Sequence, residues 1–431
     1  MTRLRKILRR NIPVWRSELR EMTRLHGNAP VSSTTLSRLL GGLRDVRAVL
    51  CDTSVVDPHE GLLIRGIPVR KLADWESEAL FFLMCTGERP DAETLVELKE
   101  SVRSRRPVPP QIWEWIENLP DGLSPMQMFS MATLALGGLA AASGSESGSV
   151  PREDLWERVL EESLDIIARL PVLSAGMYRI KCLGKPPIPP SETLDAAENW
   201  ARMLGLESVD GFVDFLRPYI VVHSDHEGAN ASVLAARVVH STHADLYGSL
   251  SAAMNGLAGP LHGLASQTSL EFIDSLRERY GPSPDDETLA RHVADMLAEK
   301  KVIPGFGHAA LRGPDPRYEI LRERGEKLCP EDPGFRMVQA LERVATPILR
   351  QAGKVKMPHP NVDAVTGVLL RHFGMEDPGF LTAMFSTAQS IGLCAQLILA
   401  RALMQPIIRP RSVTTEWLRG RFSSGDVESG A

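Results

Sequence analysis

The sequence has few cysteines and no excess of positive charge, and each shortage excludes a class of protein. Its 431 residues include five cysteines, none of them in a C-x-x-C pair, at Cys51, Cys85, Cys182, Cys329 and Cys394. Cysteines that are scattered and odd in number argue against a disulfide framework and a structural zinc site, and they predict reduced thiols in a cytoplasmic protein. Lys and Arg number 49 against 54 Asp and Glu, a net charge of −5. This balance argues against a nucleic-acid partner.

An uninterrupted apolar run of about 20 residues, the length of a membrane-spanning helix, is also missing. The most apolar segment, residues 381–400, contains Gln389, Ser390 and Gln396. This composition predicts a buried helix and no membrane partner. The N-terminus is basic but lacks the apolar stretch of a secretory signal, so we expect an amphipathic first helix, with a transit peptide as the alternative.

What the sequence does contain is a helical pattern over a chain of 431 residues. At about 150 residues per domain, this length predicts two or three compact units. Apolar residues recur at spacings of three and four, which predicts an all-α fold. We expect one helix capped by Ser191 and ended near Gly205, a second that starts at Ser283, and a third through residues 335–345. Only residues 62–69 are typical of short extended structure.

Histidine placement gives the first candidate site, because four of the 11 histidines lie between residues 223 and 243. His223 and His226 are three residues apart, as are His240 and His243, and such pairs can hold zinc from one face of a helix. Histidines satisfied by backbone groups are the more common alternative. We therefore expect no metal.

Two other histidines and one aspartate lie on segments suited to catalysis. His262 lies in the glycine-rich segment 256–263, and His308 in segment 304–308. Glycine lets the backbone turn sharply and lets a ligand come close, although a turn with a capping histidine is the alternative. Asp363 follows the proline-bounded segment 358–360, where a helix N-cap is the ordinary interpretation. Together the three predict proton transfer, with the carboxylate as base and the imidazoles as donors to a developing oxyanion.

Several arginines and lysines suit anionic ligands. Arg317 and Arg409 each stand next to a proline and can bind carboxylates by bidentate pairing. Four others can meet phosphates or can simply form a solvated face, namely Arg44, Arg312, Lys354 and Lys356.

Five segments together resemble the citrate synthase family, specifically its eukaryotic-type, dimeric branch. They are HSDHEGAN (223–230), AAMNGLAGPLHGLA (252–265), VIPGFGHAALRGPDPRY (302–318), GKVKMPHPNVDA (353–364) and RALMQPIIRP (401–410). The resemblance runs from about His26 to Arg409. It implies an all-α homodimer with a large helical domain, residues 1–262 and 375–431, and a smaller mobile domain, residues 263–374.

The resemblance also implies a role for each matching residue. Asp363 resembles the base that removes a methyl proton from acetyl-CoA, His262 the donor to the thioester oxygen, and His308 the group that polarises and protonates the carbonyl of a 2-oxo acid. The condensed thioester is then hydrolysed, which gives citrate and CoA when the oxo acid is oxaloacetate. No cofactor is implied beyond these substrates. The implied ligands of the oxo acid are His226, Asn230, Arg317, Phe385, Gln389 and, from the other subunit, Arg409. The implied CoA-binding residues are Arg44, Arg312, Lys354 and Lys356.

Gln389 departs from the family pattern, which has an arginine four residues after the phenylalanine of the oxo-acid site. Glutamine lacks the charge and the five-donor fork of arginine. A charge-assisted hydrogen bond is worth about 1.5–3 kcal/mol, so oxaloacetate binding is expected to weaken roughly ten- to a hundred-fold unless another group compensates. Three interpretations stay open: a citrate synthase that tolerates Gln389; a condensing enzyme for an oxaloacetate analogue such as phosphinopyruvate, or for a longer acyl-CoA, in specialised metabolism; and a non-catalytic CoA-binding relative.

Overall fold

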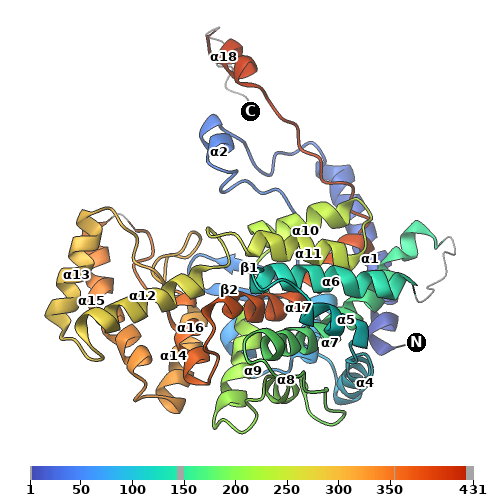
Figure 1. Ribbon diagram of the computed structural model, residues 1–431. Helices are drawn as coiled ribbons and strands as arrows, with labels where there is room; N and C mark the ends of the chain where they lie inside the picture. Colours follow the sequence, from blue (N-terminus) through green and yellow to red (C-terminus); the bar gives the residue numbers. More distant parts are fainter. Residues whose placement is uncertain (1, 143–149, 354, 424–431) are drawn as a thin grey trace.

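The computed structural model describes residues 2–142, 150–353 and 355–423, and these are mainly helical, as the sequence predicts (Figure 1). The helices up to residue 257 are α1 (Arg3–His26), α2 (Leu36–Leu40), α3 (Ser77–Thr86), α4 (Ala92–Arg103), α5 (Pro110–Glu117), α6 (Pro125–Ala142), α7 (Leu155–Lys181), α8 (Ala196–Leu204), α9 (Phe212–His223), α10 (Ala231–Ser241) and α11 (Leu246–Leu257). Those that follow are α12 (Ala265–Tyr280), α13 (Asp286–Ala298), α14 (Pro316–Leu328), α15 (Pro333–Ala352), α16 (Asp363–His372), α17 (Leu381–Ala402) and α18 (Thr415–Ser423). Short 3-10 turns occur at η1 (Val69–Leu72), η2 (Arg152–Asp154) and η3 (Pro378–Phe380).

Helix α17 is the central helix of the larger group of helices. It packs against α7, α3, α9 and α11. The stretch Pro378–Ala402 is long and apolar enough to cross a membrane, but 89% of its most apolar window is buried inside the protein. The prediction of a buried helix is therefore confirmed, and its few polar side chains, Gln389 among them, are available for internal contacts.

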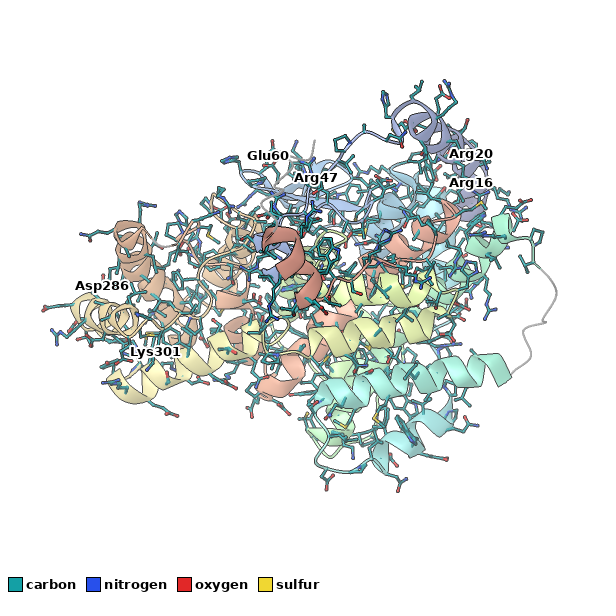
Figure 2. The ribbon with its side chains drawn as sticks, turned by 90° about the horizontal axis from the view of Figure 1, so that it is seen from above. Arg16, Arg20, Arg47, Glu60, Asp286 and Lys301 are labelled. Carbon is teal, nitrogen blue, oxygen red and sulfur yellow. The ribbon has the colours of Figure 1, made fainter. Side chains whose placement is uncertain are left out.

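Helices α12 to α16 form a second group, drawn in yellow to orange in Figure 1. They pack on one another, and they meet the first group where α14 contacts α9 and α12 contacts α17. Figure 2 shows Asp286 and Lys301 at the end of this group that lies farthest from α1, which carries Arg16 and Arg20. The five helices lie within the segment expected to form the smaller domain, residues 263–374; the division into domains stays a prediction.

A small antiparallel sheet lies beside the helices. It consists of β1 (Ser54–Asp57), β2 (Gly61–Ile64) and β3 (Ile67–Pro68), in the order β1-β2-β3. The prediction of extended structure in residues 62–69 is confirmed for residues 62–64 and 67–68, whereas Val69 begins η1 and β1 was not predicted. With four residues, β1 is too short for an alternating pattern to be distinctive.

Helix caps differ from the prediction at two of the three helices. Helix α8 is capped by Asp195, whose carboxylate accepts a hydrogen bond from the Glu198 N–H at 2.9 Å, while Ser191 forms a turn just before it. Helix α13 is capped by Asp285 instead of Ser283. In both cases a carboxylate nearer the helix caps it in place of the serine hydroxyl. The end of α8 at Gly205 and the helix through residues 335–345, part of α15, are confirmed.

The N-terminal helix is amphipathic, as predicted. Leu4, Leu8 and Ile12 of α1 are buried, and the Arg9 Nε donates to Glu157 of α7 at 2.5 Å. In the middle of α1 the Arg16 Nε donates to the Ala402 carbonyl at 2.6 Å, where α17 ends. Two segments project from the helical body, residues 27–50 with α2 and residues 404–423 with α18 (Figure 1).

Candidate active site

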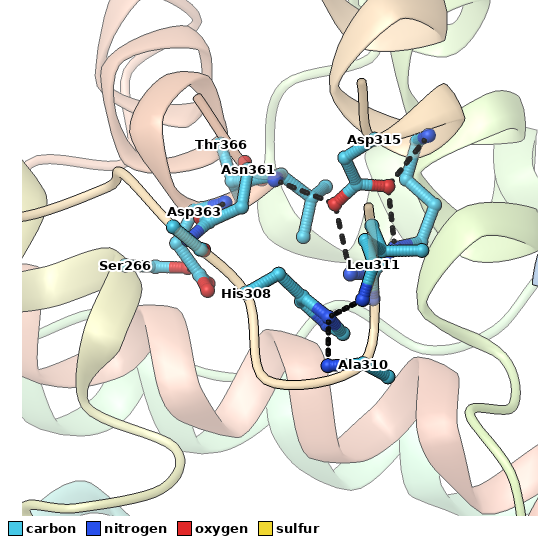
Figure 3. A network of polar contacts seen from close by, with 11 residues as sticks. Ser266, His308, Ala310, Leu311, Asp315, Asn361, Asp363 and Thr366 are labelled. Carbon is cyan, nitrogen blue, oxygen red and sulfur yellow. Dashed lines mark hydrogen bonds and ion pairs between the residues drawn. The ribbon is translucent and has the colours of Figure 1, made fainter. Parts of the chain in front are cut away.

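Two loops among helices α12 to α16 pair with each other and carry His308 and Asp363. Phe306 forms a β-bridge with Pro360, and the Asn361 N–H donates to the Gly305 carbonyl at 2.8 Å. Gly305 has φ +78°, and a Cβ there would lie 2.8 Å from the Cα of Ala364, so only glycine fits. This pairing holds together the two loops that carry His308 and Asp363 (Figure 3).

Asp363 is the first residue of α16. Its N–H donates to the Asn361 Oδ1 at 3.0 Å, and its own Oδ1 accepts a hydrogen bond from the Ser266 hydroxyl at 2.5 Å. The carboxylate therefore binds Ser266 and does not cap the helix. Burial raises the pKa of Asp363, while the hydrogen bond from Ser266 and the charge of Arg317 lower it. A carboxylate whose charged form is disfavoured by burial is a stronger base than an exposed one.

His308 has a fixed orientation because two backbone groups bind one ring nitrogen. The N–H groups of Ala310 and Leu311 each donate to Nδ1 at 3.1 Å. Nδ1 is therefore an acceptor, and the ring proton is assigned to Nε2. Burial, with the nearby Arg317 charge, lowers the pKa of His308 to about 4. The imidazole is neutral at pH 7 and offers one donor, Nε2–H.

His262 has the opposite tautomer. It lies in the turn after α11, where its Nε2 accepts from the Ser232 N–H at 3.3 Å and lies 2.9 Å from the Ser232 Oγ. Its proton is therefore assigned to Nδ1. Burial lowers the pKa of this imidazole as well. The site thus contains two neutral imidazoles that donate from different nitrogens.

Arg317 is held by a buried carboxylate that was not predicted, Asp315. The two are 8% and 0% exposed and form a two-pronged ion pair of 3.0 and 2.9 Å. Although burial favours the neutral acid, the Arg317 guanidinium keeps the pKa of Asp315 low. The Asp315 Oδ2 also accepts the N–H of Val362, the residue before Asp363, at 3.1 Å (Figure 3). The sequence signal for Asp315 was its position before Pro316 at a helix start.

Helix α17 presents Phe385 and Gln389 on one face. The ring of Phe385 meets the edge of His223 at a centroid distance of 5.2 Å, and the Gln389 Nε2 donates to the Ser232 Oγ at 3.2 Å. His223 is buried, and its Nε2 has no hydrogen-bond partner among the described residues. Two predicted oxo-acid residues and the helix that carries Ser232 thus meet at one place.

His226 and Asn230 lie in the turn before α10. The His226 ring lies edge to face with that of His308, at a centroid distance of 5.4 Å, and burial lowers the pKa of His226 well below its usual value. Asn230 caps α10: its Oδ1 accepts from Val233 N–H at 3.1 Å, and its Nδ2 donates to the His226 carbonyl at 2.9 Å. The Asn230 amide therefore shapes the turn that carries His226.

The remaining predicted residues lie on exposed segments. Arg44 and Arg409 belong to the two projecting segments, and no hydrogen bond or ion pair of the described residues joins either to the site. Arg312 is exposed beside His308 and folds back onto the carbonyls of residues 309–311. Lys356 is exposed on the loop before Asp363, and Lys354 lies outside the described residues.

The histidines that suggested a metal site do not gather with other metal ligands among the described residues. In the part of the chain that the structure describes, no three His, Cys, Asp or Glu residues gather as metal ligands do. His240 is buried, and His243 lies at the surface beyond the end of α10. The groups of the site that can act chemically are its carboxylate, its imidazoles and its guanidinium.

Comparisons with known proteins agree with the motifs. Residues 42–411 match the model of the family described as citrate synthase, C-terminal domain. Citrate synthase 4, mitochondrial, of Arabidopsis thaliana is 37% identical over 425 residues, which cover 96% of this chain and 90% of that protein. The probable mitochondrial citrate synthase of Glossina morsitans morsitans is 37% identical over 96% of this chain and 91% of its own length. The crystal structure of Thermotoga maritima citrate synthase is 26% identical, with a TM-score of 0.73 over 88% of this chain and 96% of that chain.

The cytoplasmic location expected from the cysteines is wrong by these comparisons, because the plant and insect relatives are both named mitochondrial. Reduced thiols argue only against an oxidising compartment. They cannot distinguish one reducing compartment from another.

Proposed function

Because the chain belongs to the citrate synthase family and is therefore an enzyme that condenses acetyl-CoA with oxaloacetate, we propose that Asp363, His262 and His308 carry out this reaction. Asp363 takes a proton from the methyl group of acetyl-CoA, and the Nδ1–H of His262 donates to the thioester oxygen as the enol forms. Both steps are needed together, since a thioester α-proton is far too weakly acidic for a carboxylate alone.

The enol carbon then bonds to the carbonyl carbon of oxaloacetate. The Nε2–H of His308 donates to that carbonyl oxygen, which takes up the proton and becomes the hydroxyl of citryl-CoA; the proton that Asp363 removed from the methyl group then replaces the one that His308 gave up. Water hydrolyses the thioester, so the overall products are citrate, CoA and one proton. The observation that carries this assignment is the pairing of the two loops that carry Asp363 and His308, with a neutral, fixed donor on His308. No cofactor enters the reaction.

The dicarboxylate of oxaloacetate is assigned to Arg317 and His226, with Arg409 from the partner subunit of a homodimer. The two projecting segments support this assembly, since they carry Arg409 together with exposed apolar side chains such as Leu40, Ile407 and Trp417. Exposed apolar side chains in this number are typical of a surface that another chain covers. The phosphates of CoA are assigned to Arg312 and Lys356 beside the site, and to Arg44 and Lys354.

The smaller domain, residues 263–374, is proposed to close over the substrates. It carries Asp363, His308 and Arg317, whereas His226, Gln389 and Phe385 belong to the rest of the chain. Closure would therefore change the distance between the base and the oxo acid, and would exclude water from the enol.

A second candidate substrate follows from Gln389. If the neutral amide leaves one carboxylate of oxaloacetate weakly bound, an oxo acid with a modified acidic group, such as phosphinopyruvate, would be the better partner. Gln389 is 4% exposed and directs its amide to Ser232, so it adds no charge to the oxo-acid site.

The test is free CoA release from acetyl-CoA with oxaloacetate and with a panel of other 2-oxo acids. Efficient turnover of oxaloacetate by the wild type, unimproved by Gln389→Arg, supports the citrate synthase. Preference for another oxo acid, with Gln389→Arg raising kcat/KM for oxaloacetate relative to it, supports the second candidate. No CoA release with any of them would refute both.

A further inference from the structure

One serine hydroxyl joins Gln389 to His262. Ser232, in the first turn of α10, is fully buried, and its Oγ lies 2.9 Å from the Nε2 of His262. The same oxygen lies 3.2 Å from the Nε2 of Gln389 and 2.9 Å from the Oδ1 of Asn230. The side chain of Ser232 therefore stands between a residue of the oxo-acid site and a residue of the thioester site.

Counting protons limits the direction of these hydrogen bonds. The Ser232 hydroxyl has a single proton, and the Gln389 amide nitrogen can only donate to it. The proton can point to the His262 Nε2 at 2.9 Å, to the Asn230 Oδ1 at 2.9 Å, which also accepts the Val233 N–H at 3.1 Å, or to the Gln389 Oε1, which is the most distant at 3.5 Å. The Ser232 backbone N–H also points at the His262 Nε2, at 3.3 Å, and a backbone N–H is always a donor. The backbone N–H of Ser232 thus requires an unprotonated Nε2 on His262, and the Ser232 hydroxyl can donate to the same nitrogen when Gln389 donates to it from its Nε2.

We propose that Gln389 is a positioning residue for His262: by donating to the Ser232 hydroxyl, it holds the imidazole in the tautomer that carries its proton on Nδ1. This role rests on the proposed function, in which Nδ1–H donates to the thioester oxygen. It extends that function, because a residue of the oxo-acid side of the cleft then controls the donor on the acetyl-CoA side.

The chemistry of position 389 explains why an amide suits this role. A carboxylate there would only accept, and would take the Ser232 proton away from His262. A methionine would have similar length without a donor, so the hydroxyl could rotate. An amide that donates to Ser232 strengthens the hydroxyl as a donor in turn. Because Gln389 is 4% exposed, water is not expected to replace it.

The first experiment needs no substrate. In protein labelled with ¹⁵N-histidine, the ring nitrogens of His262 are identified by their loss in His262→Asn. In the wild type we expect a protonated Nδ1 and an unprotonated Nε2, and in Gln389→Glu we expect the proton on Nε2. The same tautomer in both proteins would overturn the proposal. Ser390→Ala, on the next residue of α17 and bonded only to the Thr387 carbonyl of its own helix, is the matched control and should resemble the wild type.

The second experiment is a double-mutant cycle on CoA release. Gln389→Met should lower kcat by roughly 2- to 12-fold, the effect of one neutral hydrogen bond, with the KM for oxaloacetate unchanged. In a Ser232→Ala background the same substitution should have no further effect on kcat, because the connecting hydroxyl is gone. If the fold-changes in kcat of Gln389→Met and Ser232→Ala multiply in the double variant, or if Gln389→Met raises KM and leaves kcat unchanged, Gln389 acts directly on the oxo acid and the proposal is refuted. A wild type without CoA release would refute the proposed function alone, since the tautomer measurement remains decisive.

Discussion

The hydroxyl of Ser266 should set the acid strength of Asp363, the proposed base, and Ser266→Ala tests this. The Ser266 Oγ donates to the Asp363 Oδ1 at 2.5 Å, and this bond opposes the effect of burial on the pKa of Asp363. Without the hydroxyl, one of the contacts that lower the pKa of Asp363 is lost while burial still raises it, so the pKa should rise.

The size of the shift follows from the strength of the bond. A hydrogen bond to a charged group is worth about 1.5–3 kcal/mol, and 1.36 kcal/mol corresponds to one pKa unit. Ser266→Ala should therefore raise the pKa of Asp363 by about 1–2 units if the whole bond is lost. At a pH well below the new pKa the rate should fall roughly ten- to a hundred-fold, whereas the rate on the alkaline plateau should change much less.

The assay is the pH profile of kcat/KM, which reports groups of the free enzyme. Its acidic limb should move to higher pH in Ser266→Ala and stay in place in Ser275→Ala. Ser275 is the matched control because it lies on the same helix, α12, and donates only to the Phe272 carbonyl. An acidic limb that stays in place in a folded, active Ser266→Ala enzyme would show that Asp363 is not the group titrating there, or that Ser266 does not bind it in solution.

Two further predictions concern carboxylates. Asp363→Asn should lower kcat by about 10²–10⁴-fold, the effect of losing a positioned base. The same substitution should also make the melting temperature higher than that of the wild type at pH values above about 4. Burial raises the pKa of Asp363 in the folded protein, so the wild type loses the stability of its protonated acid as pH rises from the unfolded pKa through the folded pKa, whereas the asparagine variant does not. Near-normal turnover would refute the assignment, and an unchanged melting temperature would refute the effect of burial. Asp315→Ala should destabilise the protein by about 3–5 kcal/mol in urea unfolding, because it leaves the buried charge of Arg317 unpaired; a cost below about 1 kcal/mol, as for surface ion pairs, would show that water reaches Arg317.

The residues proposed as catalytic could be singled out from the sequence because their local segments are distinctive. His262 and His308 stand among glycines, and Asp363 follows two prolines, so each could be named without knowing the fold. Their roles came from the resemblance to a family. The structure adds which nitrogen of each imidazole carries the proton, and this depends on the backbone N–H groups of Ala310, Leu311 and Ser232.

The residues that hold the site could not be predicted, because their contacts join distant parts of the chain. Ser232 lies 157 residues from Gln389, and Ser266 lies 97 residues from Asp363. A single serine carries no chemical signal that separates such a contact from an ordinary helix start. The same limitation explains why Ser191 was wrongly predicted to cap α8. Ser191 and Asp195 are both good capping residues, and the residue at which the backbone turns into the helix decides which of them is the cap.

The charges of the site lead to a last prediction about subunits. Oxaloacetate brings two negative charges to a site whose buried arginine, Arg317, is already paired with Asp315, and Gln389 adds none. Additional positive charge must therefore come from elsewhere, and Arg409 on a projecting segment is the candidate. If it serves the partner's site in a two-fold dimer, mixing Arg409→Ala with Asp363→Asn should restore activity, because each mixed dimer holds one intact pair of Asp363 and Arg409. With free exchange of subunits, half of the dimers are mixed and each has one working site, so about a quarter of wild-type activity should return. If exchange is demonstrated and no activity returns, both residues serve the same chain's site and the cross-subunit assignment of Arg409 is wrong.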